Sequence, residues 1–180
     1  MPITLHIKAN HGWDYKRQEF IDIEEQDVEF EHCLLAIARW ESKWTKPFFT
    51  DNHSMEEWID YVGFMALDVK DYRFAHSLSQ DQIMEVINYM QQSQTATWFS
   101  EERNKPNSEQ LTSELIYYYM AQVPLPFDIC ERWNFSRLTT ILRIAAIKSQ
   151  PEKKMSQSQI AAQNKALNAA RKAKLKGLHK

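Results

Sequence analysis

The sequence predicts a mainly α-helical fold: a compact multi-helix domain with a small N-terminal β-hairpin and a projecting basic C-terminal helix. Four observations predict it. Apolar residues recur at three- and four-residue steps through much of the 180-residue chain. Ser-x-x-Glu or Ser-x-x-Gln capping boxes open three of these stretches. Two-residue alternation is confined to the N-terminal end, and a hydrophobic content of 43% is enough to build a substantial core.

Two short strands are expected first. Ile3, Leu5 and Ile7 alternate with polar residues, and residues 20–24 repeat that alternation. Residues 10–12 can turn the chain between them. Because two strands alone are marginally stable, we expect this hairpin, about residues 1–25, to pack on the helix that follows.

Residues 27–47 carry the strongest helix pattern. Asp27 can cap the start and Pro47 stops the run. The apolar stripe of this helix, with one tryptophan of the next helix, is expected to anchor the core. These core anchors are Phe30, Leu34, Ile37, Trp40, Trp44 and Trp58.

Two helices should follow a loop at residues 45–53, opened by capping boxes at Ser54 and Ser79. Their apolar stripes are Trp58, Tyr61, Val62 and Met65 in the first, and Ile83, Val86, Ile87 and Met90 in the second. The segment between them, residues 68–77, is expected to be irregular. Residues 95–107 form a polar loop that Trp98 and Phe99 are expected to pin to the body.

The body should close with two more helices, joined by one or two short turns at residues 128–133. The first of these helices is predicted over residues 108–122. It holds Leu111, Leu115, Tyr118 and Tyr119 and ends before Pro124. Residues 135–148 predict the other, with Asn134 as its cap. Its apolar face is so broad that it implies burial on more than one side.

The composition then changes at residue 149, so we expect a helical body at 1–148 and a basic C-terminal tail at 149–180. Residues 148–180 hold nine lysines and arginines and one acid, a net charge of +8, whereas the first 147 residues hold 13 bases and 23 acids, a net charge of −10. After a capping box at Ser156, the tail is rich in strong helix formers. Its apolar stripe is thin: Ile160, Leu167, Ala170 and Leu175. That combination predicts a helix that projects from the body or becomes ordered on a partner.

Motifs for enzyme chemistry are missing from the sequence. The three glycines are isolated, so there is no phosphate loop, and there is no G-x-S-x-G elbow or C-x-x-C pair. The six histidines are scattered, and the acidic pairs are adjacent residues that diverge on a helix. We expect no enzyme, no cofactor and no metal site. A site assembled from His32, Cys33 and distant acids is a remote alternative. Cys33 and Cys130 should be buried thiols in a reducing compartment.

The many aromatic residues could instead stack on nucleic-acid bases. Trp40, Trp44, Trp58, Tyr61 and Tyr118 lie on apolar stripes of an acidic body, so core packing is favoured. The tail is different, because its cations can pair with phosphates, with an acidic partner or with the acidic body itself, or can simply be solvated. The residues expected to bind a partner are Lys165, Arg171, Lys172, Lys174 and Lys176. No apolar run approaches the roughly 18 residues of a membrane span, so we expect a soluble, intracellular protein without a membrane partner.

Three blocks of the sequence resemble a group of small helical proteins from the tail and virion-structural gene region of tailed bacteriophages. They are FEHCLLAIARWESKWTKPFF at residues 30–49, ATWF at 96–99, and RIAAIKSQPEKKMSQSQIAAQNKALNAARKAKL at 143–175. Proteins of this kind often act as tail assembly chaperones, which coat the long tape-measure protein before the tail tube polymerises around it. The resemblance implies no catalytic residues.

The resemblance implies a non-enzymatic protein of phage morphogenesis that binds the tape-measure protein in the host cytoplasm. The tail would reach to this client or to a neighbouring copy in a homo-oligomer. One alternative is a structural virion subunit of the neck, tail or capsid. A further alternative is an accessory protein that binds nucleic acid through the basic tail.

Overall fold

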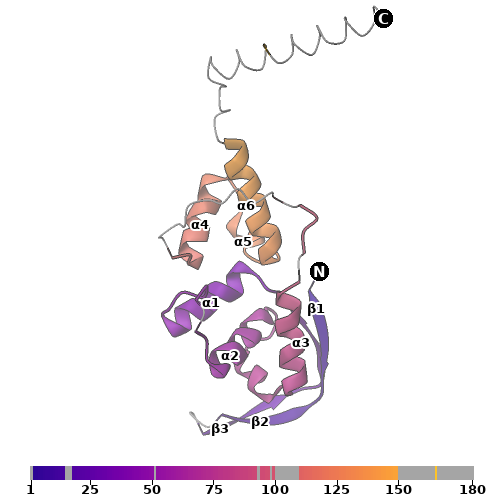
Figure 1. Ribbon diagram of the computed structural model, residues 1–180. Helices are drawn as coiled ribbons and strands as arrows, with labels where there is room; N and C mark the ends of the chain where they lie inside the picture. Colours follow the sequence, from indigo (N-terminus) through magenta and orange to yellow (C-terminus); the bar gives the residue numbers. More distant parts are fainter. Residues whose placement is uncertain are drawn as a thin grey trace, which may run out of the picture. The chain divides into compact units, whose positions relative to one another are not determined.

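The computed structural model describes residues 2–14, 18–50, 52–92, 94–97, 99, 110–149 and 165. The chain divides into two units, residues 1–145 and 146–180, and each is described by itself. Within the described residues there are four strands, six α-helices and one 3-10 helix (Figure 1). The predicted mainly helical class, with antiparallel strands near the N-terminus, is confirmed.

The strands form a longer hairpin than the sequence predicts. Strand β1 (Ile3–Ile7) pairs antiparallel with β4 (Gln26–Phe30), and β2 (Asn10–Asp14) pairs with β3 (Glu19–Ile23). The register is continuous, because Ile7 lies opposite Gln26 and Asn10 lies opposite Ile23. The predicted turn at residues 10–12 is therefore wrong: those residues lie inside β2.

Helix α1 (Leu34–Trp44) begins seven residues later than the predicted start at Asp27. Residues 26–30 are strand β4, in which Val28 and Phe30 are buried and alternate with exposed acids. This two-residue alternation belongs to a strand, and the acids had suggested a helix start instead. The residue before α1, Cys33, makes no side-chain cap. The helix ends at Thr45, which has a left-handed backbone with φ of 50°.

The next two α-helices begin as predicted. Helix α2 (Met55–Met65) opens on a capping box of Ser54 and Glu57, and α3 (Gln80–Met90) opens on one of Ser79 and Gln82. Between them, residues 68–77 were predicted to be irregular, but part of this segment forms the 3-10 helix η1 (Tyr72–Ser77). Asp71 caps η1 by accepting a hydrogen bond from the Arg73 amide.

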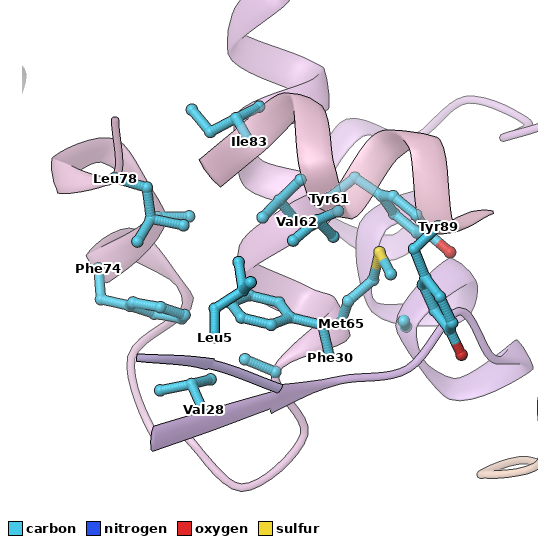
Figure 2. Packing of buried hydrophobic residues seen from close by; sticks show 14 of the residues in the cluster. Leu5, Val28, Phe30, Tyr61, Val62, Met65, Phe74, Leu78, Ile83 and Tyr89 are labelled. Atoms are coloured by element: carbon cyan, nitrogen blue, oxygen red, sulfur yellow. The ribbon is translucent and has the colours of Figure 1, made fainter. Parts of the chain in front are cut away.

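The main core joins the hairpin to α2, η1 and α3. Figure 2 shows Leu5 and Phe30 reaching from the strands towards Val62 and Met65 of α2, and Val28 on the strands belongs to the same cluster. Phe74, Leu78, Ile83 and Tyr89 enclose the same cluster. Strand alternation on the hairpin and helical spacing on α2 therefore meet in one apolar interior.

A second, smaller core holds helices α4 (Ser113–Gln122), α5 (Phe127–Cys130) and α6 (Phe135–Ser149). Its buried members are Leu34, Ile116, Met120, Cys130 and Leu138. Backbone hydrogen bonds join it to α1 and to the residues just before α1. The Leu35 amide donates to the Glu131 carbonyl at 3.0 Å, and the Phe135 amide donates to the His32 carbonyl at 2.7 Å.

Helix α6 differs from its prediction. Asn134 does cap it, since its side chain accepts a hydrogen bond from the Ser136 amide at 3.0 Å. However, Leu138 is its only buried residue, so its broad apolar face is not buried on several sides in the described chain. Of the loop predicted at residues 95–107, the structure describes residues 95–97 and Phe99. The Arg143 guanidinium lies 4.1 Å from the centre of the Phe99 ring. Trp98 lies outside the described residues.

Candidate protein-binding surface

Helix α4 carries an apolar surface that faces away from the core. The helix begins after Thr112, whose hydroxyl accepts a hydrogen bond from the Leu115 amide at 3.3 Å. Its inner side is Ser113, Ile116 and Met120, and all three are buried. These positions follow steps of three and four residues, so they lie on one side of the helix.

The side opposite to them is also apolar. It consists of Leu111 just before the helix, then Leu115, Tyr118 and Tyr119, and we call these four residues the outer face of α4. Their spacing of four, three and one residues places them together on a helical surface. Tyr118 is 58% exposed, Tyr119 39% and Leu111 37%, and Leu115 is half-buried. The expectation that Tyr118 packs in the core is therefore wrong.

A buried carboxylate sets which side of α4 faces inward. Glu41 of α1 is 7% exposed, and its Oε2 accepts a hydrogen bond from the Ser113 amide at 2.8 Å and another from the Ser113 hydroxyl. Its Oε1 accepts from the Phe48 amide at 2.8 Å. A negative charge at the first turn of α4 also interacts favourably with the helix dipole. This contact holds Ser113 inward and so leaves the tyrosines outside.

Sequence reasoning did not identify Glu41. The signal was present, because Glu41 lies four residues after Ile37 and seven after Leu34, on the apolar stripe of α1. A charged residue on such a stripe is buried, and it must then find hydrogen-bond donors. The donors lie far away in the chain, so the sequence did not reveal them.

Next to the outer face, the short helix α5 adds apolar surface. Phe127 is 43% exposed and Ile129 55%. The Phe127 ring lies 5.8 Å from that of Tyr117, whose hydroxyl donates to Glu131 Oε2 at 2.7 Å. Burial, with the carboxylate of Glu131, raises the pKa of Tyr117. The tyrosine therefore stays neutral and fixes the end of α5 beside α4.

The charged residues within the segment that forms this surface, residues 110–131, are all acidic, although Arg39 and Arg137 lie close enough to act on Tyr117 and Cys130. Residues 110–131 contain Glu114, Asp128 and Glu131 and no lysine, arginine or histidine. Glu114 and Asp128 are exposed. An apolar surface bordered by acids favours a partner that combines apolar and basic side chains.

The charged residues of the WESKWTK stretch hold α1 against α2. Lys43 bonds to Asp60 Oδ2, and His76 Nε2 lies 2.9 Å from Asp60 Oδ1. Burial would raise the pKa of Asp60, but the hydrogen bonds from His76 and Lys43 outweigh it and lower the pKa. Lys46 pairs with Glu57 at 2.5 Å, and its hydrogen bond lowers the pKa of that carboxyl. These ions are engaged in holding the fold.

The remote alternative of a site at His32 and Cys33 gains no support from the geometry. His32 Nδ1 is hydrogen-bonded to the Tyr61 hydroxyl at 2.6 Å, and burial lowers the pKa of His32 to about 4. Burial raises the pKa of Cys33 to about 11, so its thiol is not activated as a nucleophile. Both cysteines are buried free thiols. Among the described residues, no three His, Cys, Asp or Glu side chains are placed to hold a metal ion.

A second polar cluster joins three distant segments. The Tyr89 hydroxyl donates to Glu31 Oε1 at 2.6 Å, and the Asn134 amide donates to the same oxygen at 2.9 Å. Burial and the Glu31 carboxylate raise the pKa of Tyr89. The cluster connects the end of β4 to α3 and to the start of α6, which is a structural role.

The predicted core anchors lie in both cores. Phe30, Ile37 and Trp40 are fully buried in the main core, and Leu34 in the second. Trp44 and Trp58 are partly buried and pack against the main core. Of the predicted partner-binding residues, Lys165 is exposed in a helix. The other four, Arg171, Lys172, Lys174 and Lys176, lie outside the described residues.

Comparisons with protein-family models, with curated proteins and with solved structures find no match to this chain. In the part of the chain that the structure describes, no helix is long and apolar enough to cross a membrane.

Proposed function

We propose that this protein is a non-enzymatic binding protein of bacteriophage morphogenesis: a tail assembly chaperone that binds the tape-measure protein in the host cytoplasm. The observation that carries the proposal is the outer face of α4, with exposed tyrosines on the side that the core does not use. Aromatic residues on an exposed apolar surface are typical of protein-binding sites. The resemblance of residues 30–49, 96–99 and 143–175 supplies the phage context.

The proposed client fits this surface in its chemistry. A tape-measure protein is largely long amphipathic helix, and such a helix binds by placing its apolar side in an apolar groove or on an apolar face. The basic tail, which we propose projects from the body as a helix, adds cations at Lys165, Arg171, Lys172, Lys174 and Lys176. The tail would hold acidic stretches of the client while the outer face of α4 packs on its apolar side.

Co-expression with the tape-measure protein of the same phage tests the proposal. We expect the two proteins to co-purify, and the double variant Tyr118→Ser, Tyr119→Ser to reduce the recovered client at least tenfold. Deletion of residues 155–180 should leave the body folded and abolish recovery. Met84→Ser, which removes an exposed apolar residue on α3, is the matched control and should bind normally. Full recovery with both the deletion and the double variant would refute the proposal.

A structural virion subunit is the second candidate, because the same exposed apolar surface suits a permanent neighbour in the particle. Mass spectrometry of purified virions separates the two functions. A chaperone is absent from mature particles, whereas a virion subunit is present at a fixed copy number.

A further inference from the structure

The outer face of α4 and the basic tail complement each other in charge and in pattern. Residues 110–131 carry three acids and no base, whereas residues 148–180 carry a net charge of +8. The tail also has apolar residues at Ile160, Leu167 and Leu175, spaced by seven and eight positions. In a helix that spacing puts them on one side, with Lys172 and Lys174 beside the stripe and Arg171 within it.

We propose that the outer face of α4 in one copy of the chain binds residues 156–176 of a second copy. The tyrosines and leucines of the outer face would pack against the apolar stripe of the tail. Glu114 and Asp128 would lie near the cluster of Arg171, Lys172 and Lys174.

The choice of a second copy as the occupant rests on the proposed function. A contact between a face on one copy and a different segment on the next is heterologous, so it can repeat as an open chain of subunits. Open association would keep copies together before the client is present. The client would then compete with the tail of a neighbour for the outer face and displace it on binding.

Two variants of the full chain separate the two halves of this contact. The acceptor variant is Tyr118→Ser with Tyr119→Ser. The donor variant is the charge reversal Arg171→Glu, Lys172→Glu, Lys174→Glu and Lys176→Glu. The mutated tyrosines are exposed on the surface, so the acceptor variant should fold, which circular dichroism verifies.

Sedimentation-velocity ultracentrifugation without client measures the result. We expect the mass of the wild-type protein to rise above 21.4 kDa with concentration and to return to it at high salt. Each variant alone should stay at the monomer mass. The control variant Met84→Ser should associate as the wild-type protein does. An equimolar mixture of the two variants should form a heterodimer of twice that mass, because one intact acceptor and one intact donor remain.

Three outcomes would overturn the proposal. The first is that the wild-type protein remains monomeric over a hundredfold range of concentration. Binding of the tail to the outer face of its own chain would give this result. The donor variant could associate as the wild type does, which would mean that the outer faces pair with each other. The mixture could stay monomeric although the wild type associates. Because no client is present, these outcomes are independent of whether the tape-measure protein binds.

Discussion

Glu41 illustrates how a single buried charge determines the placement of a distant helix. Its carboxylate is 7% exposed and accepts hydrogen bonds from Phe48 and from Ser113, which is 72 positions away in the chain. A buried carboxylate without donors is costly, so the two bonds from Ser113 specify where α4 begins. The exposure of Tyr118 follows from this contact as much as from its own chemistry.

Glu41→Gln tests this role. The amide keeps the shape of the side chain but puts an NH2 group where one of the backbone N–H donors now points, so at least one buried donor loses its acceptor. We expect the free energy of unfolding to fall by about 1–3 kcal/mol, measured by urea denaturation. Glu85→Gln, an exposed position on α3, is the control and should change stability by less than about 0.5 kcal/mol. Equal stability of both variants would contradict the role assigned to Glu41.

His32 makes stability depend on pH. Its pKa is lowered to about 4 by burial, from an ordinary value of 6.5. The folded protein therefore keeps it neutral while the unfolded chain takes up a proton as the pH falls below 6.5. Stability is fully present above that pH and is lost as the pH falls towards 4.

Between pH 7.5 and pH 5, this linkage should remove about 2 kcal/mol of unfolding free energy. His32→Gln should be less stable at pH 7.5, because the contact with Tyr61 changes, but its stability should vary less with pH. Urea denaturation of both proteins at the two pH values measures the difference. Identical pH dependence in the two proteins would show that His32 does not titrate in this way.

At the scale of elements, the capping boxes of α2 and α3 and most of their buried stripes were predictable, since both depend on residues within a few positions. Tyr89, which is buried on α3, was missed. The presence of an N-terminal hairpin was predicted, but its length and its turn were not. Its pairing of β1 with β4 depends on residues 26–30, whose acids suggested the start of a helix. Helix α4 was predicted as a helix, but its apolar residues lie on both sides, and spacing alone does not tell which side the core selects.

Gly63 tests how closely α2 packs on η1. A Cβ atom at this position would overlap the carbonyl oxygen of Tyr72. Alanine is favoured over glycine by about 1 kcal/mol in a free helix, so propensity alone predicts a gain in stability. Packing predicts instead a net loss of about 1–3 kcal/mol for Gly63→Ala.

Thermal denaturation decides between these two effects, because helix propensity predicts a higher unfolding temperature for Gly63→Ala and packing predicts a lower one. Ser42→Ala, on the exposed side of α1, is the control in which propensity should act alone and stability should stay level or rise. A stabilising Gly63→Ala would mean that η1 yields to the added methyl group.

At the scale of the whole molecule, charge is segregated along the chain, with −10 in the first 147 residues and +8 in the rest. The division into units at residues 145 and 146 lies close to this change. Our two proposals use the segregation in the same way: the acidic body offers an apolar face, and the basic tail reaches a client or a neighbouring copy.

Ending the chain after Ser149 tests whether the body folds independently of the tail. We expect the free energy of unfolding to change by less than about 0.5 kcal/mol, because the apolar stripe of the tail is thin and α6 is kept whole. Chemical denaturation at a protein concentration where the full chain is monomeric measures this. A loss of several kcal/mol would show that the tail is part of the folded body.

By itself the sequence determined the helical class, the two capping boxes at Ser54 and Ser79, the cap at Asn134 and the separation of charge, because each depends on local spacing or on composition. Only the tertiary structure decided the strand register, the late start of α1 and the outward direction of Tyr118 and Tyr119. These depend on contacts between residues far apart in the chain, such as that of Glu41 with Ser113, and such contacts leave no local pattern. The candidate binding surface is the part of α4 that these long-range contacts leave uncovered.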